Sequence, residues 1–541
     1  MVPLSFAMEV ISVTSVGNTI SSHIGKKFTK KSYMRCQSGN GGSSENIAKV
    51  YSLRKANIII MLFSLTLFLF PFNGGLIVLP PLGEARAEPY FIISLILFPL
   101  TAFYVLSGRF KHEVYFFGFI FVGLMFIVLT SGIASVNEIV DSAYKGETGP
   151  ARFASGLAVP LFGCYYAVTL ACVAKFNLKG FILKPLILGA YVVAAFGVIE
   201  AFSWLNGGFR DLFVTATSPL FSAMRRGETV MWRIQSVTYE ASNFGFYVSL
   251  LIPLILHARR TTARPKQVML NFTLAALLLE SFFSGRTSFL AGMLGLLSFY
   301  TWLHIVRGGP YVRLGGIIFA WLVPFMVAFV PIAYNLLFED AIIADLWNTD
   351  SISNVSRYSG IFVQIKLMLS NPILGVGLNQ YGFYAAKLLP DWAYVWETQA
   401  WLYDPAASFF PSFSLYTRIG AETGITGLLL WCTMLGFLQS QVTKRGIRVS
   451  MGGGEPTLAA AILAGMMGLL FILWTVASFK IFNIWFLIGI SVSYIVNWGR
   501  FENPGGRQVP SHEERKDGSA HSNSYAKLGL LPIGKARQRF K

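Results

Sequence analysis

The stretch LLLESFFSGRTSFLAGM (residues 277–293) holds two apolar runs that are separated by a short Ser-Gly-Arg-Thr turn. Each run continues away from the turn for the length of a membrane-spanning helix, which needs about 17–25 residues. One glutamate, Glu280, lies inside the first run, and one arginine, Arg286, lies in the turn. Ionisable residues in such places face the protein interior or a wet cavity, so both residues are candidates for a functional site.

The same pattern recurs along the chain, and the composition agrees with it. Hydrophobic residues make up 54% and charged residues 13% of the 541 residues, and the mean hydropathy is +0.56. Soluble domains carry about 25% charged residues. Apolar stretches long enough to span a bilayer occur at residues 56–72, 90–107, 114–135, 153–174, 181–205, 241–257, 267–284, 287–306, 314–337, 414–439, 457–478 and 481–498. Backbone groups in hydrocarbon need internal partners, so the sequence predicts an all-α, polytopic transmembrane bundle of about 12 spans.

The distribution of basic residues predicts the orientation of this bundle. If the N-terminus is cytoplasmic, roughly 31 of the 44 Lys and Arg residues fall on the inner side, as the positive-inside bias requires. The sequence then predicts a disordered basic cytoplasmic tail over residues 1–55, the bundle over residues 56–498 and a second disordered cytoplasmic tail over residues 499–541. The net charge of +18 follows from topology and attraction to anionic lipid, so nucleic acid is not expected as a partner.

On this topology, the residues available for chemistry on the outer face are arginine, carboxylate and tyrosine. All six histidines map to the inner side, and the four cysteines show neither paired nor metal-ligand spacing, so no metal or other cofactor is expected. Arginine suits phosphate because its planar group binds two oxygens at once. Four arginines are expected to converge: Arg233, Arg286, Arg357 and Arg418. The alternative is that each anchors a helix at the interface or pairs with a nearby carboxylate, as Glu280 would for Arg286.

The longest outer segment, residues 338–412, lies between the ninth and tenth spans. It contains NPILGVGLNQYGFY, whose glycines let the backbone approach a neighbour or a ligand closely. An aromatic cluster follows, which fits either a platform for sugars or a belt of interfacial anchors: Trp392, Tyr394, Trp396, Trp401, Tyr403, Phe409 and Phe410. In the next stretch, PSFSLYTRIGAETGITGLLLW, Arg418 and Glu422 are four residues apart and share one helix face, as a structural ion pair or as a ligand site.

Three of these stretches carry a family resemblance. SGRTSFLAGMLGLL, NPILGVGLNQYGFY and SLYTRIGAETGITGLLLW, in this order, resemble the O-antigen ligase/polymerase family of bacterial membrane enzymes, which join lipid-linked glycan chains. The resemblance covers roughly residues 230–440. Ligases of this kind tend to carry a His-Asn pair ahead of the final glutamate, where this chain has Phe413 and Ser414, and this difference favours the polymerase branch. SVTYEASNFGFY, which includes Tyr239 and Glu240, resembles the segment that enters the sixth span of such polymerases.

The resemblance implies a GT-C-like membrane glycosyltransferase in the bacterial cytoplasmic membrane, with both termini in the cytoplasm. It would polymerise polyprenyl-diphosphate-linked repeat units into O-antigen or exopolysaccharide, with membrane lipid, a chain-length regulator and a flippase as further partners. The catalytic residues would be Glu240, Arg286 and Glu422. The substrate-binding residues would be Arg233, Tyr239, Arg357, Arg418 and Asn379. Two alternatives remain, a ligase that transfers finished glycan to an acceptor and a polysaccharide transporter or flippase, although the halves show no internal repeat that would indicate a transporter.

Overall fold

The computed structural model describes residues 58–72, 92–99, 111–217, 234–238, 241–339, 342–343, 352–404 and 409–502. Contacts divide the chain into two compact units, Met1–Met61 and Leu62–Lys541. The described part of the first unit is the beginning of the helix Ile58–Leu69. The predicted tails lie outside the described residues over 1–55 and 503–541, and the last described helix ends at Glu502.

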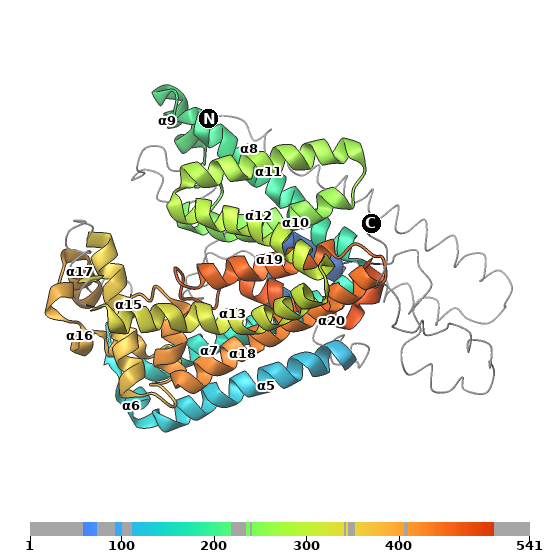
Figure 1. The fold of residues 1–541 in the computed structure, drawn as a ribbon. Coiled ribbons are helices and arrows are strands. Elements are labelled where there is room, and N and C mark those ends of the chain that lie inside the picture. The colour runs from blue at the N-terminus through green and yellow to red at the C-terminus, as the bar shows by residue number, and fades with distance from the viewer. Residues whose placement is uncertain are drawn as a thin grey trace, which may run out of the picture. The chain divides into compact units, whose positions relative to one another are not determined.

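The second unit is almost entirely helical within the described residues. Its elements, in chain order and labelled in Figure 1 where there is room, are α5 (Lys111–Ala134), α6 (Val136–Asp141), β1 (Ala143–Tyr144), β2 (Glu147–Thr148), α7 (Gly149–Asn177), the π-helical η2 (Leu178–Leu183), α8 (Lys184–Ser203), α9 (Gly207–Thr217), α10 (Ala241–Arg260), α11 (Arg264–Ser284), α12 (Arg286–Arg307), α13 (Pro310–Leu337), α15 (Ile352–Ser370), η4 (Tyr381–Phe383), α16 (Ala385–Leu388), η5 (Asp391–Ala393), α17 (Trp396–Tyr403), α18 (Leu415–Met451), α19 (Thr457–Ile472) and α20 (Phe482–Glu502). The strands of the described part form one antiparallel hairpin, in which Ala143 pairs with Thr148.

Helices lie within all twelve stretches that were predicted to span, so the all-α prediction is confirmed. In the part of the chain that the structure describes, six segments are long and apolar enough to cross a membrane by their length and composition: Gly149–Lys175, Leu178–Ser203, Arg264–Ser284, Arg286–Arg307, Pro310–Leu337 and Leu415–Met451. Shorter apolar helices cover Ile58–Leu69, Phe121–Ala134, Thr457–Ile472 and Phe482–Trp498. The protein is therefore a multi-pass helical membrane protein.

Small residues lie where the helices of the second unit approach closely. α10, α12 and α19 pack against one another, α13 packs along α18, and α7 packs along α20. A Cβ added to Gly245 of α10 would lie 3.0 Å from Cα of Ser288, and one added to Gly468 of α19 would lie 2.7 Å from Cβ of Ser249. Close backbone approach at small residues is how helices associate in membranes, where no hydrophobic force acts between them. The first turns of α10 and α12 are thereby brought together.

The segment predicted as a long outer loop contains helical structure with an apolar core of its own. Figure 1 shows α15, α16 and α17 grouped with α6 at one end of the long helices α5, α13 and α18. Buried side chains from this segment and from α18 form the small core, among them Val363, Leu367, Leu402, Phe410 and Ala421. This small core fixes the segment against the first turns of α18, where the candidate site lies.

Candidate functional site

The helix α18 changes direction at Gly424, whose backbone has φ 71° and ψ −177°. Residues 371–384, the NPILGVGLNQYGFY segment, run beside this break. The N–H of Val376 donates to the carbonyl of Ala421 at 3.1 Å, and the N–H of Ile425 donates to the carbonyl of Pro372 at 2.7 Å. The backbone groups that the break removes from the helix are thus satisfied by this segment, as buried backbone groups must be.

Two glycines allow this approach of backbone to backbone. A Cβ on Gly424 would lie 2.2 Å from the carbonyl oxygen of Ile373, and a Cβ on Gly375 would lie 2.4 Å from the carbonyl carbon of Glu422. Both glycines have positive φ, at 71° and 67°, which side chains other than glycine rarely adopt. The glycines of the 371–384 segment therefore serve a close approach within the protein, one of the two uses expected from the sequence.

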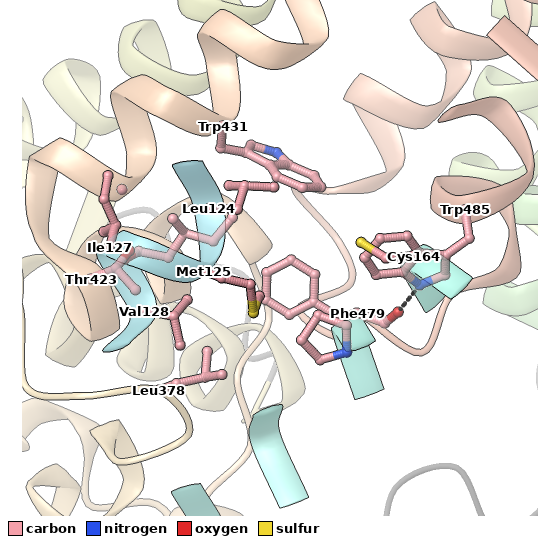
Figure 2. Close-up of a pocket in the computed structure, with 13 residues that line it drawn as sticks. Leu124, Met125, Ile127, Val128, Cys164, Leu378, Thr423, Trp431, Phe479 and Trp485 are labelled. Carbon is pink, nitrogen blue, oxygen red and sulfur yellow. Dashed lines mark hydrogen bonds between the residues drawn. The ribbon is translucent and has the colours of Figure 1, made fainter. Parts of the chain in front are cut away.

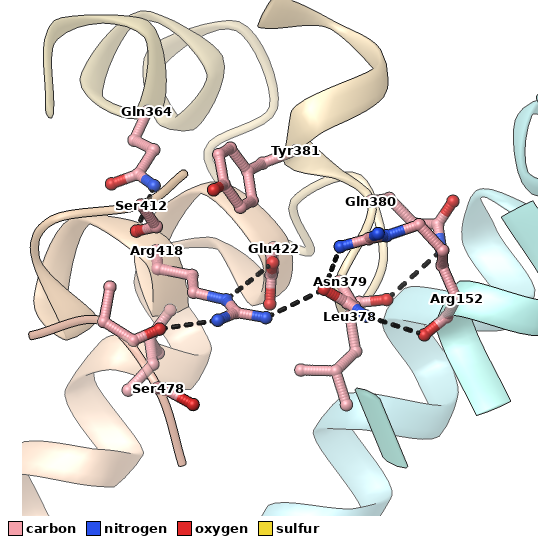
Figure 3. Close-up of polar contacts among 12 residues, drawn as sticks. Arg152, Gln364, Leu378, Asn379, Gln380, Tyr381, Ser412, Arg418, Glu422 and Ser478 are labelled. Atoms are coloured by element: carbon pink, nitrogen blue, oxygen red, sulfur yellow. Dashed lines mark hydrogen bonds and ion pairs between the residues drawn. The ribbon is translucent and has the colours of Figure 1, made fainter. Parts of the chain in front are cut away.

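Arg418 and Glu422 form a buried ion pair one turn apart on α18, as their spacing predicts (Figure 3). Nε of Arg418 donates to Oε1 of Glu422 at 3.0 Å, and Nη2 donates to Oδ1 of Asn379 at 2.9 Å. Nη1 donates to the carbonyl of Ala477 at 2.5 Å. Arg418 is 6% exposed and Glu422 is 0% exposed. A pair this deeply buried is stabilised by the direct bond between the two charges and by the further hydrogen bonds of the guanidinium.

The three bonds of Arg418 decide its role. Each of its three guanidinium nitrogens donates to the protein. The planar group therefore links α18 to Asn379 and to the connection after α19. This geometry favours a positioning role for Arg418, which holds the Glu422 carboxyl and the Asn379 amide in one place. Of the predicted site residues, these three are the ones that the structure brings together.

A second arginine, Arg152, belongs to the same network and was missed in the sequence. It lies in the first turn of α7, and its Nη2 donates to Oδ1 of Asn379 at 3.4 Å, while Nδ2 of Asn379 donates to its carbonyl at 2.9 Å. Arg152 also pairs with Glu147, and its guanidinium lies 3.7 Å from the ring centre of Phe409. An arginine in the first turn of an apolar span is the signal that could have found it.

Asn379 is the residue that joins the two arginines. Its backbone has φ 62°, a left-handed conformation that asparagine adopts more readily than most residues with a side chain. The neighbouring Gln380 donates from its side chain to the carbonyl of Gly149 at 3.0 Å, which ties the 371–384 segment to the start of α7. The network thus connects α7, the 371–384 segment and α18.

An apolar pocket adjoins this network (Figure 2). Ile419 and Thr423 line it from α18, each directly after a residue of the ion pair, and Leu378 lines it directly before Asn379. Its remaining walls come from α5, α7, α18, α20 and the connection before α20: Leu124, Met125, Ile127, Val128, Pro160, Cys164, Gly427, Trp431, Phe479 and Trp485. A charged and hydrogen-bonding cluster therefore lies beside an apolar space between helices, an arrangement suited to an amphiphilic molecule.

The aromatic cluster divides into buried and exposed members. Phe410 is 1% exposed in the small core, and Trp392 and Trp401 pack against that core. Trp396 and Tyr403 on α17 are 67% and 63% exposed. Tyr394 is also exposed, at 37%. The buried members hold the segment together, so the three exposed members carry what remains of the expectation of a sugar platform or an interfacial anchor.

The β1–β2 hairpin fastens α17 to the start of α7. The hydroxyl of Tyr144 donates to the carbonyl of Leu402, and Nζ of Lys145 donates to the carbonyls of Trp401 and Asp404, both at 2.6 Å. Burial lowers the pKa of Lys145, and the charge of Asp404 raises it by a smaller amount. The hairpin therefore links α17 to the start of α7, and Tyr144 also packs against Phe409, whose ring contacts Arg152.

The remaining predicted residues lie apart from this network or outside the described residues. Arg286 begins α12 and is exposed, and none of the ion pairs found within the described ranges joins it to Glu280, which is 2% exposed. Arg357 is exposed on α15. Arg233, Tyr239 and Glu240 lie outside the described residues. Glu240 directly precedes α10 in the chain.

Comparisons of the chain with protein families, with curated proteins and with solved structures found no match. Within the described ranges, no group of three His, Cys, Asp or Glu side chains is placed to hold a metal ion.

Proposed function

We propose that this protein is a membrane-embedded glycosyltransferase that polymerises polyprenyl-diphosphate-linked repeat units into O-antigen or exopolysaccharide. The observation that carries the proposal is the network of Arg152, Asn379, Arg418 and Glu422 beside an apolar pocket in a bundle of membrane-spanning helices. A lipid-linked glycan has an apolar chain and a polar head, and the site offers both environments side by side. The resemblance of three stretches to the O-antigen ligase/polymerase family supports the polymerase reading.

The proposed reaction joins two lipid-linked glycans without a cofactor. A hydroxyl oxygen of the incoming repeat unit attacks the anomeric carbon of the growing chain and forms the new glycosidic bond. The bond from that carbon to the lipid diphosphate breaks, and the diphosphate leaves with the electron pair. Glu240 accepts the hydroxyl proton as general base, with Glu422 as the second candidate. Arg286, with Arg233 and Arg357, stabilises the charge that grows on the leaving group.

The site geometry supports distinct roles for the two kinds of arginine. Arg418 is engaged on all three nitrogens and positions Glu422 and Asn379, so it acts on the sugars through its neighbours. Arg286 is exposed at the first turn of α12, where the unpaired N–H groups of the helix also attract anions. This first turn is the more open place for a diphosphate.

The proposal includes the topology inferred from the basic residues. The protein would have about 12 spans in a GT-C-like arrangement, with both termini in the cytoplasm of a bacterium. The Arg418 network would lie on the outer face of the cytoplasmic membrane. Lipid-linked oligosaccharide delivered by a flippase would then meet the site, and a chain-length regulator would act on the product.

A gel of surface and secreted polysaccharide from a deletion strain tests the function. We expect single repeat units in place of a ladder, restored to a ladder by the wild-type gene and left unrestored by Glu422→Ala. Long chains that are not attached to their acceptor would contradict the proposal and indicate a ligase. Complete loss of exported glycan would indicate a transporter or flippase.

A further inference from the structure

Two glutamates meet inside the bundle, away from the Arg418 network. Glu200 on α8 is 5% exposed, and Glu280 on α11 is 2% exposed. A Cβ added to Gly197 of α8 would lie 2.4 Å from both Cδ and Oε2 of Glu280. The carboxyl group of Glu280 therefore fills the space beside Gly197. Since Gly197 and Glu200 are three residues apart, Glu200 lies on the face of α8 against which the Glu280 carboxyl group packs.

The two glutamates differ in their hydrogen bonds. Oε2 of Glu200 accepts from the backbone N–H groups of Gln235 at 3.2 Å and Ser236 at 2.6 Å. Ser236 has φ 53°, and this left-handed turn aims two successive N–H groups at one carboxylate oxygen, a concave arrangement that favours negative charge. Among the residues that the structure describes, neither carboxyl oxygen of Glu280 has a hydrogen-bond partner, and both oxygens are buried. Oε1 of Gln235, in the residue that contacts Glu200, is likewise buried without a partner.

The charged and titratable groups on the neighbouring elements do not compensate Glu280. Within the described ranges, the elements packed against α8 and α11 are η2, α9, α10, α12 and the helix Ile58–Leu69, which carries no ionisable side chain. The groups at the same end of these elements are Arg210 and Asp211 on α9, Tyr247 on α10 and Arg286 on α12. Arg210 lies over the ring of Trp204, Tyr247 donates to the carbonyl of Phe70, and Arg286 and Asp211 are exposed. Tyr191 and Tyr300 lie nearer the middle of α8 and α12, and the basic residues of η2, α10 and α11 lie at the opposite end.

An ionised carboxylate in this position would be a buried charge without a hydrogen bond beside a second carboxylate. The cost of such a charge is several kcal/mol, and buried carboxyl groups escape it by holding a proton. We propose that Glu280 is a proton-binding site within the membrane domain, and that it is held there as a neutral carboxylic acid beside the ionised Glu200. The proposal is independent of the proposed glycosyl transfer.

The proton has a structural consequence for the segment before α10. Glu200 anchors residues 234–238 through two N–H bonds, and the chain enters α10 three residues later. Removal of the proton from Glu280 would place two negative charges together at this anchor. The proton on Glu280 therefore prevents a like-charge contact beside the anchor of the 234–238 segment.

Infrared spectroscopy of the purified full-length protein reads the proton directly. A protonated carboxyl group has a C=O band that a carboxylate lacks. At neutral pH, we expect such a band in the wild type, its loss in Glu280→Gln, and its retention in Glu455→Gln, which changes an exposed glutamate at the other end of the bundle. In Glu200→Gln, the band should persist at a shifted frequency. A wild type without this band, or a band that is unchanged in Glu280→Gln, would overturn the proposal.

Thermal unfolding between pH 4 and pH 9 gives a second readout that does not require a band assignment. A glutamate in the unfolded chain ionises at about pH 4.3. If Glu280 keeps its proton only in the folded protein, the stability of the folded protein falls as the pH rises above that value. The melting temperature of the wild type should fall below that of Glu280→Gln with rising pH, and the two should converge near pH 4. Replacement of sodium by choline distinguishes a bound cation. Sodium-dependent melting at neutral pH that disappears in Glu280→Gln would overturn the proposal in favour of a sodium site.

Discussion

Asn379 presents its side-chain oxygen to the guanidinium of Arg418 at 2.9 Å, although the two residues stand 39 positions apart in the chain. The same oxygen faces Arg152, which lies 227 positions away. One amide thus joins three separate parts of the sequence, and it does so from a left-handed backbone.

Two substitutions of Asn379 distinguish the contribution of its side-chain amide from that of its left-handed backbone. Asn379→Gly removes the amide and keeps the left-handed turn at no steric cost, whereas Asn379→Ala removes the amide and adds strain of about 1–2 kcal/mol. Both should lower polymer yield about ten- to hundredfold, because a bond to a charged group contributes about 1.5–3 kcal/mol. The alanine variant should also melt at a lower temperature than the glycine variant. Equal melting temperatures would contradict the strain argument.

The buried ion pair of α18 should be much more sensitive than an exposed one. Arg418→Ala leaves the charge of Glu422 buried without its partner, which should cost about 3–5 kcal/mol of stability. The matched control is Arg307→Ala, which breaks a pair with Glu455 whose side chains are 40% and 63% exposed and should cost at most about 1 kcal/mol. Melting curves of both variants in detergent measure the difference, and similar losses would show that the burial of Arg418 has no energetic effect.

Gly424 should tolerate no side chain. Gly424→Ala would place a Cβ 2.2 Å from the carbonyl oxygen of Ile373, and that oxygen belongs to backbone that cannot swing aside. Gly453→Ala is the control, because Gly453 also has positive φ, at 78°, but has nothing within 4 Å of an added Cβ. We expect Gly424→Ala to yield little folded protein by gel filtration, and Gly453→Ala to lose only about 1–2 kcal/mol. Normal folding of Gly424→Ala would mean that the 371–384 segment is not fixed against α18.

Arg286→Lys tests the role of Arg286 in the proposed reaction. Lysine keeps the charge and loses the planar group, so two-point contact with a diphosphate is lost while an interfacial anchor survives. Turnover should fall about 10²–10³-fold with near-normal melting, the loss seen when one preorganised donor is removed. Arg264→Lys, at the other end of α11, should leave turnover unchanged. Polymerisation at the wild-type rate by Arg286→Lys would show that Arg286 does not make the proposed contact with the diphosphate.

Reporter fusions test the orientation of the network. A reporter fused after Pro390, in the segment beside α17, should read as outside, and one fused after Arg445, near the end of α18, should read as inside. If both fusions read the same side, α18 does not cross the membrane as proposed, and the assignment of the outer arginines fails with it.

The parts of the structure that the sequence predicted are those that depend on local spacing. Apolar length predicted the helices, and four-residue spacing predicted the pair of Arg418 and Glu422. The place of Arg152 at the start of an apolar span is visible in the sequence, but its contact with Asn379 joins residues 227 positions apart, and no local pattern encodes that contact. Local spacing misleads for Arg286 and Glu280, for which the sequence left a pairing open. They are close in sequence, yet Gly285 ends one helix and begins another, so that Glu280 packs on Gly197 while Arg286 is exposed.

The packing of the segment after α15 could be predicted only in part. Its exposed and buried aromatics look alike in the sequence. Phe410 and Trp396 are both surrounded by polar and aromatic neighbours in the chain, and only the tertiary packing against Val363 and Leu367 buries the first and leaves the second in the open.

The junction between residues 371–384 and α18 is made largely of main-chain hydrogen bonds and of glycines with positive φ. Peptide groups are the same in every residue, so such a junction constrains very few side chains. A gene that encodes this site can therefore accumulate substitutions on both sides of the junction while the carboxyl group of Glu422 stays in place. Distant homologues of this protein should therefore keep the glycines that correspond to Gly375 and Gly424 even where the rest of their sequences have diverged.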